Sequence, residues 1–133
     1  FNPNSVDEKF DEETLKNIIA CALLMSSIDG EVHEKEWRII KDFADEHWKE
    51  EYSDFGRFQK SVWREIRTLF DENKKFQMKL NELVGKLTCN LNSHQKNTVL
   101  NLIGEVMIAD GVMTLDESKL FATFMEKLGI RII

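Results

Sequence analysis

The sequence predicts an all-α fold, a single compact bundle of about six to seven helices built around two related helix-turn-helix repeats. Three observations lead to this prediction. Proline occurs once, at Pro3, and the 133 residues include only six glycines, so little interrupts long helices. Apolar residues recur every three or four positions, which places them on one face of a helix. A chain of this length has the size of one domain, and residues 1–133 are therefore treated as one unit.

Four apolar stripes mark the first four helices. The first stripe contains Leu15, Ile18, Ile19, Ala22 and Met25, and the second contains Trp37, Ile40, Ala44 and Trp48. These two helices flank a short turn at Asp29-Gly30. The third stripe contains Phe55, Phe58, Val62, Ile66 and Leu69, and the fourth contains Phe76, Leu80, Leu83, Val84 and Leu87. Such spacing is typical of helices that bury one face.

Two further helices are predicted near the C-terminal end. Ser93 is expected to cap the fifth helix, because serine favours the N-cap position. The apolar face of this helix contains Val99, Leu102, Ile103 and Val106. It ends at a second Asp-Gly pair, Asp110-Gly111. The sixth helix is predicted to end near Lys127, where Gly129 can supply the left-handed residue that closes a helix.

An internal repeat relates the two ends of the chain at an offset of 81 positions. At this offset Asp29-Gly30 falls on Asp110-Gly111, and Glu36 falls on Glu117. The apolar phase also agrees, because Phe43 falls on Phe124. Repeat one is expected at about residues 15–48 and repeat two at about 94–130, with linking helices at about 54–90.

Composition limits the classes of partner. The net charge of −6 is opposite to that of a typical duplex-binding protein, so no nucleic-acid partner is expected. The longest uncharged run, from Asn17 to Ile28, has 12 residues, whereas a transmembrane helix needs about 20. Cys21 and Cys89 lie in apolar helical patterns without metal-binding spacing, and we expect two buried, reduced thiols. A cytoplasmic location is expected, or one at the periphery of the inner membrane.

Charge is unevenly distributed along the chain. Residues 1–56 hold 15 acids and 6 bases, a balance of −9, while residues 57–133 hold 9 acids and 12 bases, a balance of +3. Within the second part, steps of three and four residues place four cations on one helix face: Arg57, Lys60, Arg64 and Arg67. This stripe is either an ordinary solvated face or a docking surface for an acidic protein segment or anionic lipid headgroups.

The residues around both Asp-Gly turns resemble the Ala-Asp-Gly-x-hydrophobic-x-x-x-Glu signature of TerB-like domains. The segment from Ile108 to Glu117 is the closer match, because the first copy has Ile28 where Ala is usual. The resemblance extends from about Leu15 to Ile130, with the middle helices matched only in type. It implies a bacterial, all-helical domain of the kind named for tellurite-resistance operons and also found beside DnaJ-type co-chaperone domains. It also implies divalent-metal binding through the acidic positions.

The repeated polar residues have a structural interpretation. Gly30 and Gly111 can adopt the positive φ that ends a helix, and the Asp before each can accept hydrogen bonds from turn amides. Thr114 and Glu117 are spaced as a capping box. Turn and cap formation would together account for these positions without any ligand.

A metal site is the alternative interpretation of the same residues. Asp29 and Asp110 follow helix C-termini, whose partial negative charge disfavours an anion. A cation held between carboxylates of the two repeats would compensate for this. The predicted ligands are Asp29, Glu36, Asp110 and Glu117, with His33 as a further candidate. Oxygen ligands favour Mg²⁺, Ca²⁺ or Mn²⁺, and His33 would also admit a transition metal.

Recognised catalytic motifs are not present. An EF-hand loop starting at Asp29 would need glycine and glutamate where Glu34 and Ile40 stand. A zinc-protease helix starting at His33 would need a second histidine at Trp37. We therefore expect a non-enzymatic module without catalytic residues that acts through protein contacts, in a stress-response or membrane-associated assembly. The alternative is a metal-dependent enzyme, or enzyme subunit, that uses the same carboxylates to activate water.

Overall fold

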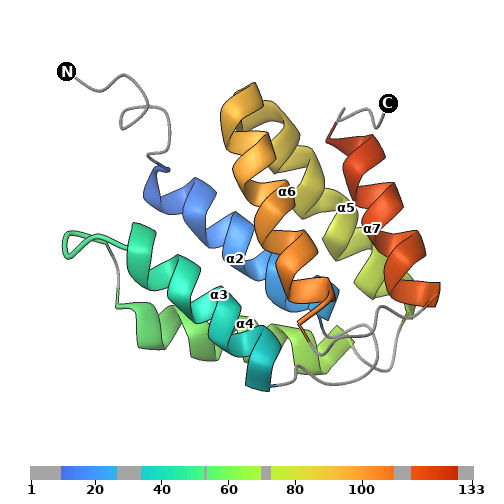
Figure 1. Cartoon of the computed structure of the whole chain (residues 1–133). Coiled ribbons are helices and arrows are strands. Elements are labelled where there is room, and N and C mark those ends of the chain that lie inside the picture. Colours follow the sequence, from blue (N-terminus) through green and yellow to red (C-terminus); the bar gives the residue numbers. More distant parts are fainter. Residues whose placement is uncertain (1–9, 27–33, 53, 70–72, 110–114, 129–133) are drawn as a thin grey trace.

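A computed structural model describes residues 10–26, 34–52, 54–69, 73–109 and 115–128 (Figure 1). Within these ranges the chain forms six α-helices and no β-strand, which confirms the all-α prediction. The helices are α2 (Glu12–Ser26), α3 (Glu34–His47), α4 (Phe55–Leu69), α5 (Asn73–Asn90), α6 (Ser93–Met107) and α7 (Leu115–Lys127). In this part of the chain, no helix is long and apolar enough to cross a bilayer.

Helix α2 is the centre of the bundle. It contacts α3, α4, α5 and α6, and in Figure 1 it lies between the α3–α4 pair and the other three helices. The uncharged stretch that follows Lys16 explains this position, because a helix that is apolar on nearly all sides can be covered on all sides. Leu15, Ile18 and Leu23 are each fully buried. Burying one such side chain stabilises the fold by roughly 1.5–3 kcal/mol.

An aromatic cluster forms where the chain passes from α3 to α4. The Trp48 ring lies edge-on to Tyr52 and Phe55, at centroid distances of 5.9 and 5.1 Å, and stacks on Phe58 at 5.6 Å. The ammonium group of Lys16, on α2, lies 5.7 Å from the centroid of the Phe58 ring. The cluster therefore holds α4 against the first turns of α2.

The predicted stripes of the second to fourth helices face the core where they are described. Ile40, Ala44 and Val62 are buried, and Phe55 and Phe58 are half-buried. On α5 the buried residues are Leu80, Leu83, Val84 and Leu87, as predicted. The side chains of Ile66, Leu69 and Phe76 lie outside the described residues.

The C-terminal helix α7 is joined to α5 by hydrogen bonds near its end. The Thr88 hydroxyl donates to the Lys127 carbonyl oxygen at 3.1 Å, and Lys127 Nζ donates to Asn81 Oδ1. The Phe124 and Leu128 side chains are buried. The predicted end of this helix at Lys127 is confirmed.

The N-cap of α6 differs from the prediction by one residue. Asn92, and not Ser93, is the cap, and its Oδ1 accepts a 2.8 Å hydrogen bond from the Gln95 amide. The Gln95 side chain accepts a 3.0 Å hydrogen bond from the Asn92 amide in return. Asparagine is as good an N-cap residue as serine. A capping box needs Glu or Gln three residues after the cap, and Gln95 is three residues after Asn92 but only two after Ser93. A complete capping box is therefore possible only at Asn92.

Cys21 is buried, as predicted, but the prediction for Cys89 is wrong because Cys89 is exposed. On α5 the position of Cys89 is two residues after the buried Leu87, so its side chain is on the opposite side of the helix. Burial raises the pKa of the Cys21 thiol to about 12, because the thiolate would lose its hydration. The two thiols therefore have different reactivities.

Helix boundaries agree with the offset of the predicted repeat, but the packing around the two copies differs. α2 spans 12–26 and α6 spans 93–107, which are 81 positions apart at both ends, and α3 and α7 begin 81 apart. However, α3 packs extensively against α6, whereas the main neighbour of α2 is α5 and not α7. The Asp29-Gly30 and Asp110-Gly111 turns, together with Thr114 and Gly129, lie outside the described residues.

Candidate functional site

The structure describes few of the predicted metal ligands. Asp29, His33 and Asp110 lie outside the described residues, as does the side chain of Glu117 on α7. Glu36 is described, in the first turn of α3, with only 2% of its surface exposed. Among the described residues, no three His, Cys, Asp or Glu side chains are grouped as metal ligands. The metal site therefore remains a prediction from the sequence.

The predicted basic stripe lies on the solvent side of α4. Arg57, Lys60, Arg64 and Arg67 are all exposed, while Val62 on the same helix is buried. Among the described residues, none of these four cations forms a salt bridge. We call these four side chains the basic face of α4. Its charge is therefore available to a ligand.

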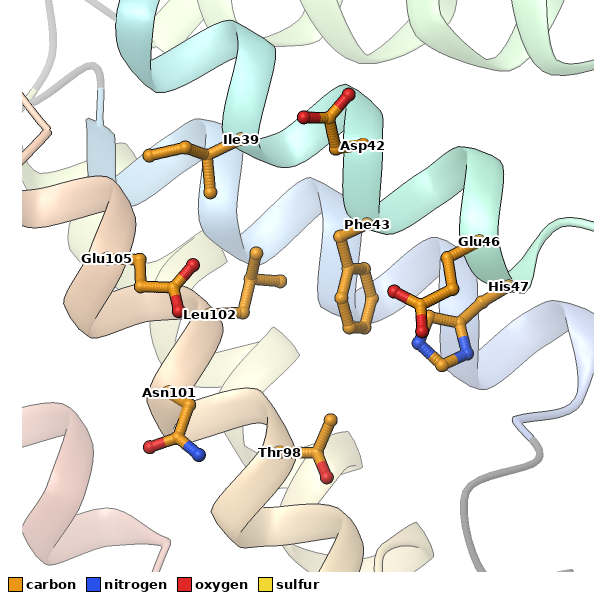
Figure 2. Close-up of a pocket in the computed structure, with 9 residues that line it drawn as sticks. All are labelled: Ile39, Asp42, Phe43, Glu46, His47, Thr98, Asn101, Leu102 and Glu105. Atoms are coloured by element: carbon orange, nitrogen blue, oxygen red, sulfur yellow. The ribbon is translucent and has the colours of Figure 1, made fainter. Parts of the chain in front are cut away.

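A groove lies between α3 and α6 (Figure 2). Its volume is about 400 Å³. The groove is lined from α3 by Ile39, Asp42, Phe43, Glu46 and His47, and from α6 by Thr98, Asn101, Leu102 and Glu105. Because α3 and α6 pack extensively against each other below it, the two walls are rigid parts of the bundle.

Three apolar side chains form the floor of the groove and are supported from behind, although the exposed lining as a whole is more polar than apolar. Leu102 is buried, and Ile39 and Phe43 are half-buried. The Phe43 ring centroid lies 4.4 Å from that of His47 and 6.1 Å from that of Phe10, and Phe10 is itself buried. This packing limits rotation of the Phe43 side chain, so the floor does not have to form when a ligand arrives.

The rim of the groove is acidic. Asp42 and Glu46 lie one turn apart on α3, Glu105 lies on α6, and all three side chains are exposed. In Figure 2, Glu46 and Glu105 lie on opposite sides of Leu102 and Phe43, and the Asp42 carboxylate points away from them. No lysine or arginine lines the groove, and within the described residues none of the three carboxylates forms a salt bridge. The groove therefore has three carboxylates without a salt bridge in the described part of the chain, and His47, which can carry a positive charge, also lines it.

Some carboxylates elsewhere on the described surface do form salt bridges. Glu34 pairs with Arg38 at 3.1 Å, one turn further along α3. Glu65 on α4 pairs with Lys79 on α5 at 2.9 Å. Other exposed carboxylates, such as Asp45, Glu50 and Glu126, also form no salt bridge within the described residues. What distinguishes the groove is that three such carboxylates line one concave surface.

Sequence reasoning did not find the groove. Two signals were present in the second helix, where Ile39 and Phe43 are four residues apart and so are Asp42 and Glu46. This spacing places apolar and acidic pairs side by side on one helix face. The other wall could not be recognised, because Glu105 is 59 positions beyond Glu46 and nothing in the pattern shows that α6 lies against α3.

Neither a family model, nor a curated protein, nor a solved structure matches this chain. The groove combines apolar side chains on its floor, carboxylates on its rim, and the Asn101 amide and Thr98 hydroxyl on one wall. Apolar surface supplies affinity, and charges on the rim select the ligand.

Proposed function

We propose that the protein is a non-enzymatic helical module that works by binding other proteins. The observation that carries this proposal is the groove between α3 and α6, whose apolar floor is already formed and open to solvent. Grooves between packed helices commonly receive a helix of a partner protein. The bundle beneath the groove serves as the rigid support that such recognition requires.

The basic face of α4 supports a second contact in the same assembly. Its four cations lie on α4, and none of them lines the groove between α3 and α6. A module with one acidic and one basic surface can hold two partners of opposite charge at once. We infer that the basic face binds an acidic protein segment, in line with the complementarity that steers association of charged surfaces.

The proposal also includes a TerB-like, stress-response role in a tellurite-resistance-type or membrane-associated assembly. This role rests on the Asp-Gly…Glu segments of the sequence. The equal offset of the α2 and α6 boundaries is consistent with the repeat on which that resemblance depends. We also propose that Mg²⁺, Ca²⁺ or Mn²⁺ binds at these turns, with Glu36 and Glu117 among its ligands. The proposed location of the protein is the cytoplasm or the periphery of the inner membrane. These parts of the proposal are tested separately from the groove.

Affinity capture with matched variants tests the binding role. The tagged protein is used to recover partners from cells of its own source, and the partners are quantified by mass spectrometry. Asn101→Trp places a large ring in the groove from an exposed position, and Ala122→Trp makes the same addition at an exposed position of α7. We expect at least one partner to be recovered with wild type and Ala122→Trp and lost with Asn101→Trp. Identical partner sets for all three proteins would refute a role for the groove.

The basic face is tested in the same experiment. Arg57, Lys60, Arg64 and Arg67 are reversed to glutamate together, and we expect a different, acidic partner to be lost. If this variant recovers the same proteins as wild type, the basic face is ordinary solvated surface.

A further inference from the structure

We propose that the ligand of the α3–α6 groove is a cationic amphipathic helix, which places apolar side chains on the Phe43–Leu102 floor and lysine or arginine against Asp42, Glu46 and Glu105. This inference rests on the proposed function, because it names the chemical class of the partner for the same groove.

The dimensions of the groove suit a short length of helix. On α3 the lining residues run from Ile39 to His47, and on α6 from Thr98 to Glu105. At 1.5 Å per residue these walls are roughly 10–12 Å long, which equals about two turns of a helix laid alongside. Two turns present two or three apolar side chains on one face, spaced at i, i+3 and i+4. The cavity of about 400 Å³ has space for such side chains, over a lining in which polar groups expose more surface than apolar ones.

Charge decides which amphipathic helix is preferred. Three exposed carboxylates line the groove, and no lysine or arginine lines it. An acidic helix would bring more negative charge to this rim and would be repelled by it. A neutral helix would form no ion pair with the rim carboxylates. A helix with basic residues beside its apolar stripe would instead pair with carboxylates on both walls. Arginine is especially suitable, because its guanidinium can bind a carboxylate through two hydrogen bonds.

The basic face of α4 on a second copy of this chain is a poorer occupant. Its four cations could meet the carboxylates, but the apolar residue Val62 of the same helix is buried within its own bundle. The floor of the groove would then remain uncovered. A separate amphipathic segment can cover the floor with its apolar side chains and pair with the rim carboxylates through its basic side chains.

Binding of a designed peptide tests the ligand class directly. The probe is an 18-residue amidated, alanine-rich helix with leucine at i, i+4 and i+7 and arginine beside the stripe on both sides. One control peptide has the same composition in scrambled order, and another has glutamate in place of arginine. Affinity is measured by calorimetry at low and high salt, and the site is located from NMR shift changes of the ¹⁵N-labelled full chain.

The protein variants separate specific contacts from overall charge. Asp42→Asn, Glu46→Gln and Glu105→Gln are combined in one triple variant. The control triple variant combines Asp45→Asn, Glu50→Gln and Glu126→Gln, which replace exposed carboxylates outside the groove, so both variants lose three negative charges. Each exposed ion pair lost should weaken binding about threefold to fivefold, so the first variant should bind roughly 30- to 100-fold more weakly. The control should differ from wild type by less than fivefold.

Each outcome has a distinct meaning. Support requires shift changes in α3 and α6, a weakening by high salt, and loss of affinity in the groove variant only. Equal binding of the scrambled or acidic peptide, or equal losses in both triple variants, overturns the cationic-helix assignment. Self-association of the free chain that the groove variant abolishes would assign the groove to a second copy instead. If a cellular partner still depends on the groove while the basic helix does not bind, the ligand class is wrong and the proposed function stands.

Discussion

The hydroxyl of Tyr52 donates a 2.7 Å hydrogen bond to the backbone carbonyl oxygen of Phe10, a residue 42 positions earlier in the chain. This bond joins the connection between α3 and α4 to the residues that precede α2. The Phe10 ring lies 5.2 Å from the His47 ring and 6.1 Å from the Phe43 ring, centroid to centroid. The bond therefore links the aromatic cluster around Trp48 to the support of the groove floor.

Replacing Tyr52 with phenylalanine should lower the free energy of unfolding by about 1 kcal/mol. The ring contact with Trp48 is retained, while the Phe10 carbonyl loses its side-chain donor. Urea unfolding followed by tryptophan fluorescence measures the change. A stability equal to that of wild type would mean that water replaces the hydroxyl without cost.

The N-cap of α6 gives a comparison between two adjacent residues. Asn92→Ala should lower the free energy of unfolding by about 1 kcal/mol, because the Gln95 amide loses the Asn92 side chain as acceptor. Ser93→Ala should change it by less than about 0.5 kcal/mol, since Ser93 is already inside the helix. Both values come from urea unfolding with unchanged m-values. A larger loss at Ser93 than at Asn92 would contradict the assigned cap.

The two cysteines should react with a thiol reagent at very different rates. Cys89 is exposed and Cys21 is fully buried, so Ellman's reagent should modify one thiol per native chain at pH 8 and two after unfolding in guanidinium. Cys89→Ser should abolish the native reaction, and Cys21→Ala should leave it unchanged. Two rapidly reacting thiols in the native protein would show that the environment of Cys21 opens easily.

Stability should also fall at alkaline pH because of Cys21. Its pKa is raised from 9.0 to about 12 by burial, so between these values the unfolded chain loses a proton that the folded chain keeps. The unfolded state is then favoured, and stability falls as pH rises. From pH 8 to pH 10, wild type should lose about 1.4 kcal/mol more than Cys21→Ala, measured by urea unfolding at each pH. Parallel losses in the two proteins would contradict this account.

The proposed metal site is tested by thermal stabilisation. Mn²⁺ or Ca²⁺ should raise the melting temperature of wild type, because a ligand that binds only the folded state stabilises it. The double variant Glu36→Gln, Glu117→Gln should lose most of this increase, because glutamine retains a capping amide but not the charged ligand. Glu126→Gln, at an exposed position of α7, is the control. Equal increases in wild type and the double variant would mean that these carboxylates do not hold the ion.

Much of the local structure followed from the sequence. All six described helices were expected, since the 3.6-residue periodicity of apolar residues needs no tertiary information. The uncharged run after Lys16 also agrees with the burial of α2, most of whose residues are buried. The errors were local as well. Ser93 and Asn92 are both good caps, and Cys89 was expected to be buried although it lies two positions beyond Leu87 and so off the predicted stripe of α5.

The groove required the tertiary structure. Sequence periodicity shows that Asp42 and Glu46 share a face of α3, but it carries no information about which helix lies beside that face. Only the packing of α3 against α6 brings Glu105 to the same rim and Leu102 to the same floor. The sequence by itself determined where the helices form and which faces are apolar, because these depend on residues within a few turns. The tertiary structure decided which faces meet, because that depends on how all six described helices share one core.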